Sequence, residues 1–127
     1  MRLPIVVASF LLCSAALPAW AAGDAEEGKK VFNQCRGCHQ VGEKARNTVG
    51  PVLNGLFGRE AGTVPGYRYS DANKESGITW DDEVFAEYIR NPRGKIPGTK
   101  MIYAGLKDDK KIADLTAYLH EFDDIKP

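Results

Sequence analysis

The stretch Cys35-Arg36-Gly37-Cys38-His39 decides the fold of this chain. Two cysteines three residues apart, followed directly by a histidine, form the C-x-x-C-H pattern that attaches a c-type haem. The two thiols can add to the vinyl groups of the porphyrin as thioethers, and the adjacent imidazole can then bind the iron as an axial ligand. The sequence therefore predicts haem tethers at Cys35 and Cys38 and an iron ligand at His39.

Upstream of this motif, residues 1–21 have the pattern of a secretory signal peptide. Arg2 supplies a positive charge, an apolar run follows, and Ala19 and Ala21 place small residues at the −3 and −1 positions of a cleavage site. An N-terminal membrane anchor is the alternative, but the apolar run is shorter than the roughly 20 residues of a spanning helix. We therefore expect cleavage after Ala21 or Ala22 and export to the periplasm, where disulfides can form.

Length and composition limit what the remaining chain can be. The sequence has 127 residues, with 17 basic and 17 acidic side chains and 27% charged residues. Zero net charge argues against a nucleic-acid binder that works through bulk positive charge, and ordinary hydrophobicity argues against disorder and against stable membrane insertion. Residues 22–127 suit a single domain with a modest core. Removal of the leader takes away Cys13 and Met1, so that two cysteines and Met101 remain.

Other chemistry can use the same pair of cysteines. A thioredoxin-like pair needs a β-α-β context, and no segment alternates apolar and polar residues long enough for a strand. A structural zinc site needs four ligands, and a plain disulfide is the third alternative in an exported protein. From the usual soft zinc ligands, the chain beyond the leader offers only Cys35, Cys38, His39 and His120. We favour haem because His39 follows the cysteine pair directly.

Helical patterns recur along the domain, separated by segments rich in glycine and proline. Three main helices are expected, over about 24–36, from a capping box at 79–82 to Asn91-Pro92, and over about 108–122. A short helix is expected at 70–75, whereas 40–66 and 93–105 are expected to be loops. So few helices give a thin core for a domain of this length. A buried porphyrin would supply the missing apolar volume.

The sixth coordination position of the iron decides between electron transfer and catalysis. An open position permits catalysis or gas binding, whereas a strong protein ligand gives an electron carrier. Met101 ends the rigid loop 96–101 (Ile-Pro-Gly-Thr-Lys-Met), far from any helical stripe. Methionine most often packs in a core, but this position suits a ligand better. Met101, rather than His120 at the end of the last helix, is therefore the predicted second ligand.

A set of short motifs extends over nearly all of residues 22–127. They are Gly28-x-x-Val31-Phe32, C-x-x-C-H at 35–39, Gly50-Pro51, Leu56-Phe57-Gly58-Arg59, Tyr69-Ser70-Asp71-Ala72-Asn73, Gly77-Ile78-Thr79-Trp80, Asn91-Pro92, the loop 96–101 and Leu115-x-x-Tyr118-Leu119. With these motifs the chain resembles the class I cytochromes c, and within them the bacterial cytochromes c2. The resemblance implies the all-α cytochrome c fold, with three main helices, short helices and long loops wrapped around one covalently bound haem c.

The resemblance also implies how the site is built. The Pro51 carbonyl would accept the Nδ1 proton of His39, and this bond would strengthen the ligand. Tyr88 would reach the sulfur of Met101, and Gly28 would let the first and last helices approach closely. The positions that bind the haem propionates or nearby water are matched by Arg59, Tyr69, Asn73, Trp80 and Thr99.

Ligands on both sides of the iron leave no position for a substrate, so we expect a soluble periplasmic one-electron carrier rather than an enzyme. The leading hypothesis is a monomer that carries electrons from a cytochrome bc complex to a terminal oxidase, a peroxidase or a photosynthetic reaction centre. The alternative is a haem c enzyme or a ligand sensor with a displaceable Met101. Basic residues around the Met101 loop are expected to dock acidic partners. They are Arg93, Lys95, Lys100 and Lys107.

Overall fold

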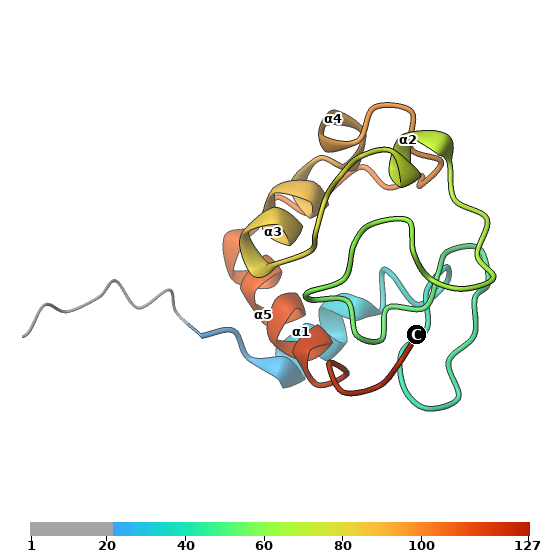
Figure 1. Cartoon of the computed structure of the whole chain (residues 1–127). Coiled ribbons are helices and arrows are strands. Elements are labelled where there is room, and N and C mark those ends of the chain that lie inside the picture. The colour runs from blue at the N-terminus through green and yellow to red at the C-terminus, as the bar shows by residue number, and fades with distance from the viewer. Residues whose placement is uncertain (1–21) are drawn as a thin grey trace, which may run out of the picture.

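The structure, a computed structural model, describes residues 22–127 (Figure 1). The predicted signal peptide at 1–21, with Cys13 in it, lies outside the described residues. Within 22–127 the regular structure is helical, without a β-strand, and the expectation of an all-α fold is confirmed. The helices are α1 (Ala25–Phe32), α2 (Asp71–Lys74), α3 (Asp82–Arg90), α4 (Pro92–Lys95) and α5 (Asp109–His120).

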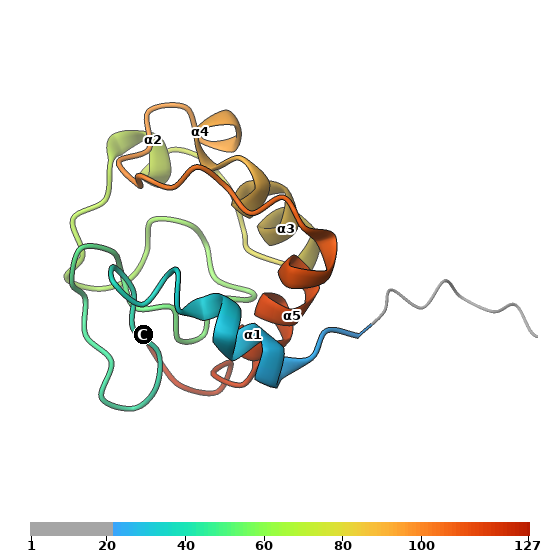
Figure 2. The ribbon, with the colours of Figure 1, turned by 180° about the vertical axis from the view of Figure 1, so that it is seen from behind.

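The first and last helices, α1 and α5, pack against each other in both views (Figures 1 and 2). Their backbones approach closely at Gly28, where a Cβ atom would lie 1.9 Å from the carbonyl oxygen of Asp114. One turn further along, the ring of Phe32 lies 5.4 Å from that of Tyr118, between centroids. A larger residue at position 28 would push the two helices apart, so glycine fixes this crossing.

A buried carboxylate ties the beginning of α1 to α5. The side chain of Asp114 is 5% exposed and pairs with Lys110 at 2.7 Å. Its other oxygen accepts the backbone N–H of Asp24 at 2.8 Å. Asp24 is in turn the N-cap of α1, because its side chain accepts the N–H groups of Glu26 and Glu27.

The helix α3 begins two residues later than the capping-box pattern suggests. The N-cap is Asp81, whose side chain accepts the N–H of Val84 at 2.8 Å, and not Thr79. Thr79 instead forms an isolated bridge with Glu60, flanked by a hydrogen bond from the Trp80 N–H to the Arg59 carbonyl. The prediction of the start was wrong because this contact with a distant loop holds Thr79 in an extended conformation.

Two further differences concern the end of α1 and the presence of α4. The structure ends α1 at Phe32 and continues in hydrogen-bonded turns through Cys38, whereas the pattern suggested a helix to about residue 36. The helix α4 lies in a segment that was expected to be a loop. It begins with proline at its first position, and the Asn91 side chain caps it by accepting the N–H of Gly94.

Long loops make up the other side of the molecule, opposite α1, α3 and α5 (Figures 1 and 2). They carry buried apolar residues such as Leu56 and Trp80 into the same core as the helices. Loops of this length are uncommon in a compact domain unless they serve a function. In the part of the chain described here, every helix is too short or too polar to cross a membrane.

Candidate haem site

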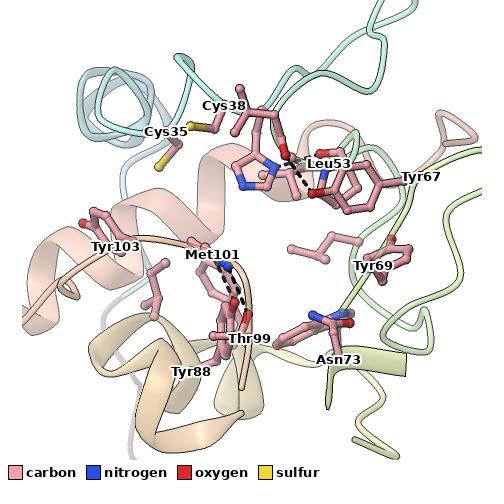
Figure 3. Close-up of a pocket in the computed structure, with 18 of the residues that line it drawn as sticks. Cys35, Cys38, Leu53, Tyr67, Tyr69, Asn73, Tyr88, Thr99, Met101 and Tyr103 are labelled. Atoms are coloured by element: carbon pink, nitrogen blue, oxygen red, sulfur yellow. Dashed lines mark hydrogen bonds between the residues drawn. The ribbon is translucent and has the colours of Figure 1, made fainter. Parts of the chain in front are cut away.

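A cavity of about 490 Å³ lies between the helices and the loops. Cys35 and Cys38 reach it from the turns after α1, and Met101 reaches it from the opposite side, next to Tyr88 of α3 (Figure 3). Tyr69 and Asn73 close a third side. Segments far apart in the sequence therefore meet around one apolar space of the size that holds a cofactor.

The imidazole of His39 is oriented for binding a metal. Its Nδ1 atom lies 2.7 Å from the Pro51 carbonyl oxygen, which can only accept, so Nδ1 carries the proton. Nε2 is then the free lone pair, and it belongs to a ring that lines the cavity. Burial lowers the pKa of His39 and outweighs the opposite effect of the Pro51 bond. The ring is therefore neutral at pH 7, the form that binds iron.

Met101 is also held by a hydrogen bond. The hydroxyl of Tyr88, on α3, donates to the Met101 sulfur at 2.9 Å (Figure 3). A thioether sulfur has two lone pairs, so one remains for a metal when the other accepts from Tyr88. The backbone N–H of Met101 is 3.3 Å from the Thr99 hydroxyl, which fixes the end of the loop. The structure thus brings Met101, Tyr88 and Thr99 together at one wall of the cavity.

The surroundings of the two cysteines disfavour the alternatives to haem. Cys35 and Cys38 are not joined in a disulfide. Burial, with a further contribution from Cys38, raises the pKa of the Cys35 thiol to about 11, so this thiol is a poor nucleophile for disulfide exchange at neutral pH. Residues 22–127 contain no cluster of three or more His, Cys, Asp or Glu that could hold a zinc ion.

Polar groups gather at the third side of the cavity, around Tyr69 and Asn73. The Tyr69 hydroxyl accepts the N–H of Val64 at 3.1 Å, which leaves its proton free to donate. The Oδ1 atom of Asn73 is buried without a partner, the one such side-chain atom among the described residues. Buried polar atoms normally have partners, so Asn73 indicates a polar group or water in the cavity. Arg59 and Trp80 also line the cavity.

Comparisons with known proteins agree with this geometry. The family model of cytochrome c matches residues 25–123. Cytochrome c2 from Blastochloris viridis is 59% identical over 118 residues, which cover 93% of this chain and 92% of the relative. Cytochrome c-550 from Nitrobacter winogradskyi is 55% identical over 101 residues, 80% of this chain and 93% of the relative. The solved structure of cytochrome cH from Methylobacterium extorquens aligns with a TM-score of 0.74 and 44% identity, over 78% of this chain and 99% of that one.

The chain belongs to the cytochrome c family. It is a class I cytochrome of the bacterial c2 type, and its fold is the cytochrome c fold. As a member of this family it carries one covalently bound haem c with its iron. It is an electron-carrier cytochrome and not an enzyme.

Sequence reasoning missed several residues of this cytochrome that shape the cavity. Gly50 lies against the His39 ring, where a Cβ atom would be 2.4 Å from Cε1. Tyr67 lines the cavity and donates from its hydroxyl to the Val49 carbonyl at 2.7 Å, which joins two parts of the long segment between α1 and α2. Tyr103 also lines the cavity. Tyr67 lies two residues before the motif 69–73, and Tyr103 lies two residues after the loop 96–101. This proximity to a motif was the one sign of their role in the sequence.

Arg59 has partners in the chain itself. Its Nη1 donates to the Asn54 carbonyl at 2.7 Å, and its Nη2 lies 3.5 Å from the Val52 carbonyl. Burial lowers the pKa of Arg59, although a guanidinium stays charged at any ordinary pH. A partly buried positive charge at the polar side of the cavity suits the carboxylates of a haem.

The four basic residues expected to dock partners differ in their surroundings. Arg93 and Lys95 lie on α4, and Lys95 pairs with Glu87 at 2.5 Å. Lys100 lines the cavity, donates to the Arg68 carbonyl and lies 4.4 Å from the centre of the Tyr67 ring. Lys107 donates to the Arg90 carbonyl. Within residues 22–127, Arg93, Lys100 and Lys107 have no ion-pair partner, and Arg93 is the one of the four that makes no side-chain hydrogen bond.

His120 does not line the cavity. It ends α5, where its two ring nitrogens each lie 2.6 Å from a carboxylate, that of Asp82 and that of Asp123. Its ring stacks on Phe57 with the centroids 4.0 Å apart. His120 does stand at the end of the last helix, as expected, but no pattern in the sequence indicates these three contacts.

Proposed function

We propose that this cytochrome transfers single electrons through a haem tethered to Cys35 and Cys38, with His39 and Met101 as the two axial ligands. The observation that carries the proposal is that each ligand atom is oriented into one cavity by its own hydrogen bond. Pro51 orients the imidazole at 2.7 Å, and Tyr88 orients the thioether at 2.9 Å. Held in this way, both ligands keep their places when the charge of the iron changes.

The surroundings of the site favour the reduced state. When bound, the haem supplies the Fe(II)/Fe(III) couple, and a soft thioether ligand such as Met101 raises its reduction potential. The cavity is walled by buried residues including Phe85 and Leu115, and low polarity disfavours the net positive charge of the oxidised site. The neutral His39 adds no charge of its own. We therefore expect a high-potential carrier.

The alternative function, a haem c enzyme or ligand sensor, requires Met101 to leave the iron readily. The Tyr88 bond and the packing of Met101 against the core oppose such a movement. With both axial positions filled by protein ligands, the iron has no place for a substrate. We therefore favour the carrier.

An absorption spectrum of the oxidised protein tests this proposal. We expect the wild type to show a Met–Fe(III) charge-transfer band, and we expect Met101→Ala to abolish it. His120→Asn is the matched control, because it removes the other candidate ligand of the sequence and leaves the cavity lining intact. A wild type without the band, or a band that survives Met101→Ala, would contradict His/Met ligation.

The tethers have a separate test. We expect the haem to stay with the polypeptide after denaturation and acid extraction of the wild type, because thioether bonds are covalent. The double variant Cys35→Ser/Cys38→Ser has neither thioether and should release the haem. Colour that separates from the wild-type chain would contradict thioether attachment.

We further propose that the mature protein begins after Ala21 or Ala22 and works in the periplasm as a monomer. The signal-peptide pattern of residues 1–21 supports the location. A cytochrome bc complex is the proposed donor, and a terminal oxidase, a peroxidase or a photosynthetic reaction centre is the proposed acceptor. The similarity to a cytochrome c2 supports this role. Arg93, Lys95, Lys100 and Lys107 are proposed to contact the partners.

A further inference from the structure

The segment 102–105 follows the proposed ligand Met101 and has few hydrogen bonds to the rest of the molecule. Within the described residues, none of its backbone groups forms a hydrogen bond to another segment. Regular backbone hydrogen bonding resumes at Leu106, whose N–H donates to the Ile89 carbonyl at 2.8 Å. Ile102 lines the cavity, and Gly105 lies against the backbone of Arg90. Residues 102–105 are therefore positioned by packing and by side-chain contacts rather than by backbone hydrogen bonds.

One side-chain hydrogen bond crosses from this segment to the opposite wall of the cavity. The hydroxyl of Tyr103 donates to Oε1 of Gln34 at 3.1 Å, and the two residues are 69 positions apart. Gln34 directly precedes Cys35, so the bond joins the Met101 side of the cavity to the side that carries the cysteines and His39. Figure 3 shows Tyr103 near Cys35, away from Tyr69 and Asn73.

The loop is anchored on its other side by Lys100. This residue donates to the Arg68 carbonyl and lies over the Tyr67 ring. Tyr103 and Lys100 therefore restrain the loop from the two sides of Met101, one toward Gln34 and one toward Arg68. Within the described residues, the bond from Tyr103 is the one hydrogen bond that joins residues 102–105 to another segment.

We propose that Tyr103 is a positioning residue, and that its hydroxyl bond to Gln34 is a latch that keeps the Met101 loop closed over the haem. The inference rests on the proposed His/Met ligation. The sulfur of Met101 can leave the iron only if this loop moves outward, and that movement breaks the latch. The latch therefore lowers the population of the open state without touching the iron or the sulfur.

The hydroxyl, rather than the ring, is what the inference depends on. The ring of Tyr103 packs against the core and would pack there equally well in phenylalanine. The bond to Gln34 lies near solvent, so water competes with it and its net effect is modest. A bond of this kind should change the ratio of open to closed loops by roughly three- to tenfold.

The experiment titrates oxidised holoprotein with imidazole, which competes with Met101 for the iron. Loss of the Met–Fe(III) charge-transfer band reports binding. We expect Tyr103→Phe to bind imidazole about three- to tenfold more tightly than the wild type, with an unchanged denaturation midpoint of the reduced protein. The matched control is Tyr118→Phe, which removes one hydroxyl at the contact of α1 and α5, away from the Met101 loop. Its imidazole affinity should equal that of the wild type.

A second variant keeps the inference testable if Tyr103→Phe perturbs packing. Gln34→Leu removes the partner of the latch, and we expect it to tighten imidazole binding by a similar factor. The double variant should bind no more tightly than either single variant, because both remove the same bond. An unchanged affinity in Tyr103→Phe, or fully additive effects in the double variant, would overturn the latch. A wild type without the charge-transfer band would instead overturn the proposed ligation.

Discussion

The His39 ring is placed by two adjacent residues that act in different ways. Pro51 accepts its Nδ1 proton at 2.7 Å, while Gly50 leaves the space that the ring occupies. A Cβ atom at position 50 would lie 2.4 Å from Cε1 and 2.8 Å from Nε2 of His39. Both ring atoms belong to a side chain that the Pro51 bond and the cavity walls hold in place, so neither can move freely.

Substitution of Gly50 by alanine should therefore disturb the ligand. We expect Gly50→Ala to lower the free energy of unfolding of the holoprotein by about 1–3 kcal/mol, because overpacking forces a buried ring to shift. Denaturant unfolding followed by the Soret absorbance measures the change. Gly37→Ala is the matched control, since a Cβ atom there would meet nothing within 4 Å. Equal stability of the two variants would contradict this role of Gly50.

At the scale of residues, the sequence predicted which side chains carry the chemistry of the site, but not the hydrogen bonds that hold those side chains in place. Cys35, Cys38 and His39 stand in one local motif. Met101 is the one methionine beyond the leader, so composition alone limits the candidates for a methionine ligand to this residue. The bond between Tyr103 and Gln34 depends instead on where two loops meet in space. The spacing of residues along the chain does not predict that Tyr103 and Gln34 come within hydrogen-bond distance of each other.

At the scale of elements, the main helices could be predicted because their apolar residues recur at helical spacing. The ends of these helices could not be predicted, because contacts with distant segments compete there with local capping signals. Thr79 has the side chain of a good N-cap, but its backbone is engaged with Glu60, and Asp81 caps α3 instead. The helix α4 has no apolar stripe, and it forms where Asn91 and Pro92 supply a cap and a fixed φ angle.

The end of α5 and the beginning of α3 are joined by His120, and this contact depends on pH. Burial alone would lower the pKa of His120, but the hydrogen bonds to Asp123 and Asp82 outweigh it and raise the pKa above its usual value. A raised pKa means that the folded state binds the proton more tightly than the unfolded state. The stabilisation is therefore complete below about pH 6.5 and is lost as the pH rises through the raised pKa.

We expect His120→Gln to lower the free energy of unfolding by about 0.5–1 kcal/mol at pH 5.5, and by less at pH 9. The effect is small because the carboxylate of Asp82 is 65% exposed and solvent screens the pair. Thermal unfolding of the oxidised holoprotein between pH 5.5 and 9 measures it. Asp123→Asn should reduce the same pH dependence. A difference between wild type and His120→Gln that stays constant over this range would contradict the assignment.

At the scale of the whole molecule, neutrality conceals an uneven distribution of charge. The chain has 17 basic and 17 acidic residues, yet no acidic residue lies between Glu87 and Asp108 in the sequence. This stretch contains α4 and the Met101 loop, and with them the four residues proposed to contact partners. Lys95 is largely compensated by Glu87, whereas Arg93 is exposed on α4. The patch is therefore weaker than the count of its basic residues suggests.

This difference between neighbours gives the docking proposal a sharp test. We expect the second-order rate of electron exchange with a purified cytochrome bc complex to fall as ionic strength rises, because salt screens exposed charges beyond a Debye length of about 10 Å at 0.1 M. Arg93→Gln should reduce both the rate at low salt and its dependence on salt. The double variant Lys95→Gln/Glu87→Gln should have a smaller effect, because it removes both members of a pair joined at 2.5 Å and leaves the net charge of the patch unchanged. Stopped-flow kinetics over a series of salt concentrations measures both slopes. Rates indifferent to salt, or a double variant as impaired as Arg93→Gln, would contradict docking through the charges of this patch while leaving the haem chemistry untouched.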